Sequence, residues 1–247
     1  MNRSPDSSNH CGAVLVGIPA FNEEASIAPV IVQAQRFADE VLVCDDGSTD
    51  STWREASKVG AIVVRHENNL GYGAALATIF KEAAKRKFQV LVTMDADGQH
   101  DARDIPKLTE PIRMGRAEVV LGSRLLHSSY RDLGYRGVGV EIFTRITNFI
   151  TEREFSDVQS GLRSYSAEAV RTVPPNETGM GASLEILLRA VYGGLPILEV
   201  PVAINHRVSS RKNYQYKPLE HALDLIFGLT RTLIRTSRPW NSQRGMG

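Results

Sequence analysis

The stretch VLVTMDADGQH at residues 90–100 decides the fold, because a run of strand character ends directly in two carboxylates, Asp95 and Asp97. The continuously apolar start, Val90-Leu91-Val92, predicts a strand buried on both faces, as in a parallel sheet covered by helices. In such a sheet, ligands bind beyond the carboxyl ends of the strands. The two aspartates therefore mark a candidate ligand site at one edge of a parallel sheet.

Similar runs recur on both sides of this stretch and alternate with helical patterns, which predicts parallel strands joined by crossover helices. The expected strands are 13–18, 40–44, 61–65, 89–94 and 118–121. The expected helices between them are 26–38, 51–59, 72–86 and 105–114. The sequence therefore predicts an α/β fold with a mostly parallel central sheet and helices on both faces.

The second half of the chain has a different texture, rich in Gly, Ser, Tyr and Arg from residue 122. The elements expected there are helices at 141–151 and 183–192, a strand at 197–204 and a last helix at 218–236. We expect a polar, disordered leader at 1–12, one domain at 13–215 with halves 13–121 and 122–215, and a basic amphipathic helix and tail at 216–247.

Composition narrows the function classes. The 247 residues carry 29 Lys+Arg against 28 Asp+Glu, and a net charge of +1 argues against a generic nucleic-acid binder. The apolar runs fall short of the ~20 residues that a membrane span requires. Cys11 and Cys44 lack metal-ligand spacing, which fits a reducing compartment, and the leader has no signal-peptide pattern.

Acidic clusters follow three of the expected strands, at residues 19–24, 45–50 and 95–99. Like charges this close repel, so each cluster needs a cationic or hydrogen-donating partner. Asp95 and Asp97 offer the hard oxygen ligands that suit Mg²⁺ or Mn²⁺. The first two clusters predict hydrogen bonds to a nucleoside base or ribose.

Two other ligand-binding motifs are considered for this edge, a calcium-binding EF-hand and a glycine-rich phosphate loop. An EF-hand is excluded because its sixth and twelfth positions hold His100 and Pro106. The glycines of Asn68-Asn69-Leu70-Gly71-Tyr72-Gly73 predict tight packing at a helix start rather than a phosphate cradle, since the third glycine of a cradle is missing.

Seven segments then resemble one family in order. They are PAFNEE (19–24), VCDDGSTDST (43–52), NLGYGAA (69–75), TMDADGQH (93–100), LGSR (121–124), SDVQSGLRSYS (156–166) and EVPV (199–202). They are similar to the inverting family 2 glycosyltransferases of GT-A fold, and most closely to polyprenyl-phosphate sugar transferases related to dolichol-phosphate mannose synthase. The resemblance covers residues 13 to about 215.

The resemblance implies a donor such as GDP-mannose or a UDP-hexose. It assigns the base and ribose to Pro19, Ala20, Asn22, Glu23, Asp45 and Asp46, and the metal and diphosphate to Asp95, Asp97 and Gln99. Asp97 is then a catalytic residue, and Arg207 and Lys212 belong to a basic segment that closes over the diphosphate. The metal acts as a Lewis acid on the leaving group, and a single displacement inverts the anomeric centre.

On the acceptor side, the resemblance implies a polyprenyl or dolichyl phosphate clamped by Arg124, with Arg131 or Arg136 as a second clamp. Ser160 and Arg163 belong to the family stretch D-x-x-S-G-x-R and are candidate acceptor-binding residues. An ionised phosphate needs no strong general base. The alternative acceptor, a carbohydrate hydroxyl, needs one, and Glu185 is either that base or a glutamate on a helix surface.

Two further functions stay as alternatives: a phosphoryl-transfer enzyme with Asp95 as nucleophile, and a non-catalytic binding module. The first expects Thr or Val where Gln99 stands. From residue 205 onward, eight basic and two acidic residues give +6. The helix at 218–236 packs on its own domain or lies on an anionic membrane, and the second interpretation predicts a cytoplasmic enzyme bound peripherally to the cytoplasmic face of a membrane.

Overall fold

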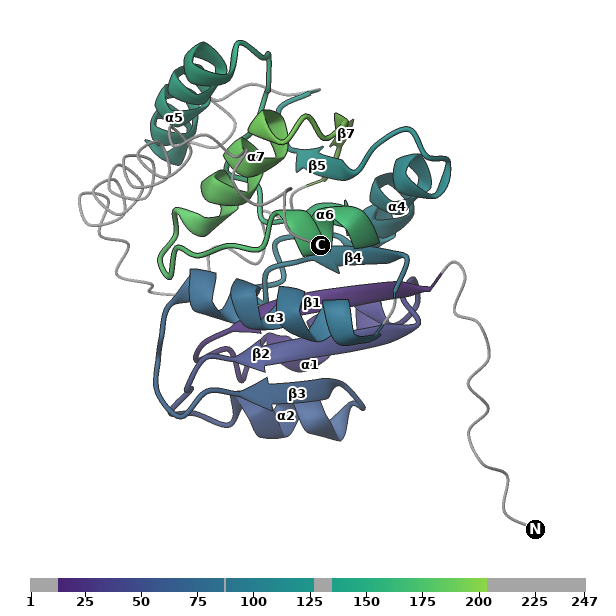
Figure 1. Ribbon diagram of the computed structural model, residues 1–247. Coiled ribbons are helices and arrows are strands. Elements are labelled where there is room, and N and C mark those ends of the chain that lie inside the picture. The colour runs from purple at the N-terminus through teal and green to yellow at the C-terminus, as the bar shows by residue number, and fades with distance from the viewer. Residues whose placement is uncertain (1–12, 87, 127–134, 204–247) are drawn as a thin grey trace, which may run out of the picture.

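A computed structural model of the chain describes residues 13–86, 88–126 and 135–203. Within them, seven strands form one sheet in the order β3-β2-β1-β4-β6-β5-β7 (Figure 1). The strands are β1 (Val14–Ala20), β2 (Glu40–Asp45), β3 (Ile62–Arg65), β4 (Val90–Thr93), β5 (Val119–Ser123), β6 (Arg163–Ser166) and β7 (Ile197–Pro201). All pairs are parallel except those that β6 makes with β4 and β5. The mostly parallel sheet is confirmed.

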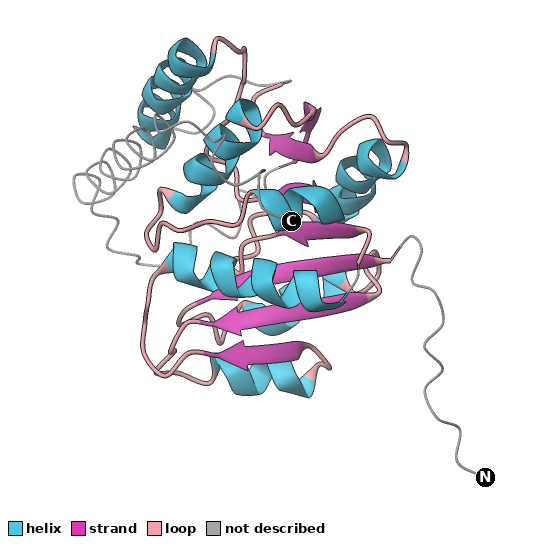
Figure 2. Cartoon of the chain, in the orientation of Figure 1, coloured by secondary structure: helices cyan, strands magenta, loops and turns pink. Residues whose placement is uncertain are grey.

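Helices connect these strands (Figure 2). They are α1 (Ile27–Ala34), α2 (Thr52–Lys58), α3 (Tyr72–Arg86), α4 (Ile105–Arg113), α5 (Tyr135–Thr151), α6 (Ala167–Thr172) and α7 (Ala182–Tyr192), with a short 3-10 turn, η1 (Ala102–Asp104), before α4. In Figure 1, α3 lies in front of the sheet and α1 behind it.

Two apolar cores lie on the two faces of the sheet, because successive side chains of a strand point to opposite faces. In β1, Val14 and Val16 pack with α1 and α4, whereas Leu15 packs with α3 and α7. The expectation of helices on both faces is therefore confirmed.

The antiparallel strand β6 was not predicted, because Arg163-Ser164-Tyr165-Ser166 lacks an apolar run. All four residues are nevertheless buried. Their polar groups find partners inside the protein; Ser164 Oγ, for example, donates to the carbonyl of Leu108 at 2.7 Å. Burial of hydrogen-bonded polar groups is tolerated where burial of unpaired ones is not.

Other boundaries also differ from prediction. The strand β7 ends at Pro201 rather than at 204, α5 begins at Tyr135 rather than at 141, and α1 ends at Ala34 rather than at 38. The leader, the predicted helix at 218–236 and the residues Arg131, Arg207 and Lys212 lie outside the described residues. Among the described helices, none has both the length and the hydropathy needed to cross a membrane.

Candidate functional site

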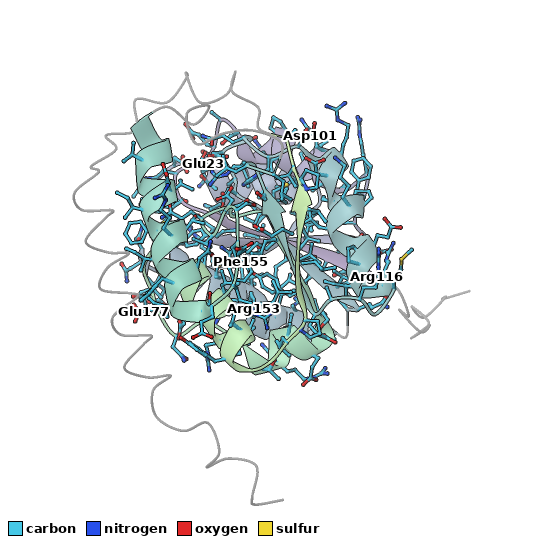
Figure 3. The ribbon with its side chains drawn as sticks, turned by 90° about the horizontal axis from the view of Figure 1, so that it is seen from above. Glu23, Asp101, Arg116, Arg153, Phe155 and Glu177 are labelled. Carbon is cyan, nitrogen blue, oxygen red and sulfur yellow. The ribbon has the colours of Figure 1, made fainter. Side chains whose placement is uncertain are left out.

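The loops after β1, β2, β4 and β5 leave the sheet at one edge. The register pairs Ala20 with Asp45 and Gly17 with Thr93, so the acidic clusters that follow these strands are neighbours. Two antiparallel pairings through β6 turn β5 back to the direction of β4, which places Arg124 at the same edge. Figure 3 shows Glu23 and Glu177 on this side of the molecule and Arg116, which precedes β5, on the opposite side.

The loops after β1 and β2 are bound to each other. Asn22 adopts the left-handed conformation (φ 55°), donates its N–H to Ser48 Oγ at 2.9 Å and accepts the N–H of Thr49 at its side-chain oxygen, also at 2.9 Å. The N–H of Glu23 donates to Thr52 Oγ1 at 2.7 Å. Pro19 and Ala20 are buried at the end of β1. The predicted donor-binding residues of the two loops are therefore brought together.

Asp46, which is predicted to bind the nucleoside of the donor, has several partners inside the protein. Its carboxylate is buried, lies 2.7 Å from His66 Nδ1, and accepts the N–H groups of Leu70 and Gly71 at 3.0 and 2.8 Å. These partners occupy the carboxylate from inside the protein. Asp46 consequently holds the loop that leads into α3, and its predicted contact with the nucleoside stays a prediction.

Asp45 is also buried, and the positive charge of Arg65 compensates its negative charge. Arg65 Nε lies 3.0 Å from Asp45 Oδ2, and the Arg65 guanidinium stands over the ring of Trp53 at 5.4 Å from its centroid. Ser48 donates its N–H to Asp45 Oδ1 at 3.2 Å. Arg65 and Trp53 were missed in the sequence because nothing in their local pattern links them to this edge. Their half-exposed surface makes them further candidates for contact with a base.

The glycines at the start of α3, Gly71 just before the helix and Gly73 in its first turn, are packing positions, as predicted. A Cβ on Gly73 would lie 2.0 Å from the carbonyl oxygen of Glu177, and a Cβ on Gly71 (φ +100°) would lie 2.4 Å from the carbonyl oxygen of Thr178. The N–H of Gly73 donates to the Thr178 carbonyl at 2.7 Å. The start of α3 therefore packs directly on the segment that precedes α7.

Asp95 and Asp97 lie in the turn after β4, partly exposed. His100 Nε2 lies 3.1 Å from Asp95 Oδ2, and Asp97 Oδ1 accepts the N–H of Gln99 at 2.9 Å. Burial raises the pKa of Asp95, but the hydrogen bond from His100 and the charges of His100, Arg124 and Arg163 outweigh it, so the pKa lies below its usual value. Asp95 is therefore ionised at neutral pH.

The Asp95–Asp97 turn fits a divalent cation. No group of three or more His, Cys, Asp or Glu side chains converges among the described residues. Mg²⁺ does not need one, because it is commonly bound by one or two carboxylates together with substrate phosphates. A Cβ on Gly161 would lie 2.3 Å from Asp95 Oδ2, so glycine leaves the space that this carboxylate occupies. His100 orients the carboxylate, as outer partners of metal ligands do.

Arg124 is held at the same edge by Asp157. Arg124 Nε donates to Asp157 Oδ2 at 2.5 Å and Nη2 to Oδ1 at 2.8 Å, a bidentate pair, and the Arg124 N–H donates to Oδ2 at 3.2 Å. Burial raises the pKa of Asp157, but the hydrogen bonds and the positive charge of Arg124 lower it by a larger amount. The net pKa is therefore below the usual value. Burial lowers the pKa of Arg124, and the charges of Asp157, Asp95 and Asp97 more than offset this. The arginine and the acidic turn therefore lie within electrostatic reach of each other.

Arg163 lies beneath the loop instead of at its surface. Its guanidinium is buried and donates to the carbonyls of Ser160, Val158 and Ser183 at 2.8, 2.6 and 2.5 Å. The side chain shapes the loop through these bonds, and its predicted contact with the acceptor stays a prediction. Ser160 is buried, and its hydroxyl has no hydrogen-bond partner within the described part of the chain. Ser160 thus remains a candidate acceptor residue.

Glu185 does not lie on the helix surface, which was one of its two predicted roles. It is buried in α7, and its Oε2 accepts the N–H groups of Asn176 and Glu177 at 2.8 and 2.7 Å. Because the side chain is buried, Glu185 is not a surface glutamate, and its role as a general base stays a prediction. Its carboxylate fixes the segment against which the loop before α3 packs.

Several known proteins are similar to this chain in sequence. The sequence model described as Glycosyl transferase family 2 matches residues 15–173. The UDP-N-acetylglucosamine–dolichyl-phosphate N-acetylglucosaminyltransferase of Methanococcus voltae is 32% identical over 75% of this chain and 82% of the relative. The dolichyl-phosphate hexose transferase of Haloferax volcanii is 31% identical over 81% and 85%.

One solved structure extends the likeness to three dimensions. Glucosyl-3-phosphoglycerate synthase from Mycobacterium tuberculosis, crystallised with Mn²⁺, uridine diphosphate and phosphoglyceric acid, is 22% identical, with a TM-score of 0.71 over 90% of this chain and 78% of that chain. At this identity, the likeness concerns the fold. The expected GT-A fold is confirmed.

Proposed function

The chain belongs to glycosyl transferase family 2, and on this premise we propose that it transfers a hexose from a nucleoside diphosphate sugar to a polyprenyl or dolichyl phosphate. The observation that carries the proposal is the position of Arg124. It is fixed by Asp157 at the carboxyl edge, within electrostatic reach of Asp95 and Asp97. The acidic turn would bind a metal and the donor diphosphate, and the arginine would bind a second phosphate. This arrangement suits a reaction between two anionic substrates.

The names of the relatives support the acceptor class more than the donor. The Methanococcus voltae and Haloferax volcanii relatives are both named for dolichyl phosphate. The donor named in the first is a UDP sugar, and another relative, from Pyrococcus furiosus, is a dolichol-phosphate mannosyltransferase that is 31% identical over 87% of this chain and 63% of the relative. UDP-hexoses and GDP-mannose are therefore both candidate donors.

Asp95 and Asp97, with Gln99, would hold Mg²⁺ or Mn²⁺, which supplies Lewis-acid stabilisation of the leaving diphosphate when bound. Asn22, Glu23 and the loop after β2 bind the nucleoside side of the donor. Arg124 orients the acceptor phosphate, whose oxygen attacks the anomeric carbon from the face opposite the diphosphate, with inversion.

The engaged state of Glu185 favours a phosphate acceptor over a hydroxyl. A hydroxyl needs a base to remove its proton, whereas a phosphate oxygen is already ionised at neutral pH. Glu185 was the candidate base; it is buried, and one of its carboxylate oxygens accepts two backbone N–H groups. This weakens the case for a hydroxyl acceptor.

Val202 and Ala203, which precede the predicted basic segment in the sequence, lie close to this edge. The N–H of Val202 donates to the Ser123 carbonyl at 2.9 Å, and that of Ala203 to Asp104 Oδ2 at 2.8 Å. Arg207 follows four residues after Ala203, a reach of up to roughly 14 Å of extended chain. This supports Arg207, and with a longer reach Lys212, as residues that contact the diphosphate.

Labelled donor, incubated with Mn²⁺ and synthetic polyprenyl phosphate, tests the proposal. We expect label in the organic phase and its loss in Asp97→Asn. The matched control is Asp101→Asn, whose carboxylate pairs with Arg103 at the surface. Label that enters only water-soluble glycan would exclude the lipid acceptor. A thermal-shift panel of UDP and GDP sugars identifies the donor, since a ligand at 100 times its Kd adds about 2.7 kcal/mol.

We propose further that the enzyme acts at the cytoplasmic face of a membrane, bound peripherally through residues 216–247. The net charge of +6 from residue 205 onward and the apolar stripe of the predicted helix support this. The full chain should sediment with anionic vesicles at low salt and be released at high salt. Equal recovery in the supernatant with and without vesicles would exclude membrane binding by this segment.

A further inference from the structure

Glu199, in β7, holds the loop that carries Asp157. It stands beside Leu121 of β5 in the parallel register. Its carboxylate accepts the N–H of Ser156 at 2.9 and 3.1 Å, the Ser156 hydroxyl at 3.0 Å and the N–H of Asp157 at 3.3 Å. One side chain of β7 thus receives three donors from two successive residues of the neighbouring loop.

These bonds continue to Arg124 by two routes. The first runs through Asp157, whose side chain accepts from the Arg124 backbone N–H and from two of its guanidinium nitrogens. The second runs through Ser156 Oγ, which lies 2.6 Å from Ser123 Oγ, the group that accepts the N–H of Leu125 at 3.1 Å. Glu199 therefore restrains the backbone on both sides of Arg124 as well as its ion-pair partner.

Burial and the charge of Asp157 both disfavour the ionised form of Glu199. Burial raises its pKa, the hydrogen bonds from Ser156 and Asp157 lower it, and the negative charge of Asp157 raises it again, so that the net pKa is above its usual value. A second carboxylate so close to Asp157 is electrostatically unfavourable.

We propose that Glu199 is a positioning residue for Arg124, acting through Ser156 and Asp157 to aim the guanidinium at the acceptor phosphate. This inference rests on the proposed function, because the acceptor phosphate is part of it. Glu199 itself touches neither substrate. Its loss should therefore impair acceptor binding and leave donor binding intact.

The test is Glu199→Gln in the full chain, assayed with varied donor and varied polyprenyl phosphate. The glutamine amide places N–H groups against the donors of Ser156 and Asp157, so we expect the acceptor KM to rise about tenfold, equivalent to about 1.4 kcal/mol. The donor KM should stay within twofold. Glu118→Gln is the matched control, since Glu118 accepts the Ser166 hydroxyl at the opposite end of β5, and both KM values should be unchanged there.

Ser156→Ala is the second variant if Glu199→Gln does not fold. It removes one donor to Glu199 and should raise the acceptor KM less, with the donor KM again unchanged. Equal effects on both substrates, or an effect on kcat alone, would overturn the inference.

A wild-type enzyme inactive on polyprenyl phosphate would instead refute the proposed function. A double-mutant cycle of Glu199→Gln (or Ser156→Ala) and Asp157→Asn, read by urea unfolding without substrate, then decides whether Glu199 acts through Asp157. Additive effects on the free energy of unfolding would overturn the inference, and coupling would support it.

Discussion

Replacement of Asp157 by asparagine tests how the acceptor side of the site is held. Asp157 is fully buried, and Arg124 is 18% exposed at its side chain, so solvent screens the pair weakly. Removal of one partner of a buried pair costs about 3–5 kcal/mol because it leaves an uncompensated charge. Asparagine keeps one acceptor oxygen for Arg124, so we expect a loss near the lower end, about 3 kcal/mol in the free energy of unfolding at pH 7.

The pH dependence gives this prediction its sign. Because the pKa of Asp157 is lower in the folded protein than in the unfolded chain, the pair stabilises the fold above the unfolded pKa of about 3.9. That stability is lost as the pH falls through the folded pKa. Urea unfolding of wild type and Asp157→Asn should therefore show a constant difference from pH 7 to 5 that shrinks below pH 4.

A surface pair is the matched control. Asp101→Asn removes the partner of Arg103, whose side chain is 81% exposed, and exposed pairs contribute under about 1 kcal/mol. The reasoning about Asp157 fails if the two variants lose similar stability at pH 7. It also fails if the Asp157→Asn deficit is independent of pH down to pH 3.

Three further substitutions or reactions have defined outcomes. Gly161→Ala places a Cβ 2.3 Å from Asp95 Oδ2 and should weaken metal binding. The Mn²⁺ concentration that gives half-maximal activity should rise about tenfold. Gly73→Ala meets the Glu177 carbonyl at 2.0 Å and should cost about 1–3 kcal/mol in urea unfolding. Burial raises the pKa of Cys44 to about 12; mass spectrometry after iodoacetamide treatment at pH 8 should find Cys44 unmodified in the native protein and alkylated in urea.

The sequence predicted those parts of the fold that depend on apolar periodicity. The buried runs of β1, β2 and β4 and the helix of residues 72–86 follow from short-range pattern alone. The glycines at the start of α3 were also interpreted correctly, because a missing Cβ is a local property. The acidic clusters were placed at one edge because parallel strands end together.

What the sequence did not show is which polar side chains turn inward. The strand β6 is polar in sequence, and its burial depends on partners such as the Leu108 carbonyl, 56 residues away. Asp46 and Glu185 look like site carboxylates but accept backbone N–H groups from distant loops. Glu199 gave no signal, since its donors lie 42 and 43 residues earlier. Long-range hydrogen bonds leave no periodic trace.

The protein itself compensates part of the repulsion expected among the three acidic clusters. Two unit charges 4 Å apart interact by about 4 kcal/mol at an effective dielectric of 20, and Asp45 and Asp46 of the second cluster, like Asp157 outside the clusters, have a basic or ring-nitrogen partner at shorter range. Asp45 has Arg65 at 3.0 Å, Asp46 has His66 at 2.7 Å, and Asp157 has Arg124 at 2.5 Å.

In the turn after β4, Asp95 has a more distant partner and a more exposed side chain than Asp45, Asp46 or Asp157. Asp95 has the imidazole of His100 at 3.1 Å, the longest of these four contacts, and its side chain is 35% exposed. A neighbouring carboxylate, Asp97, stands two residues away. The need for a cation that the sequence suggests for the whole edge is thus concentrated in the Asp95–Asp97 turn. Chelation should therefore abolish donor binding without loosening the loops that Asp46 and Asp157 hold.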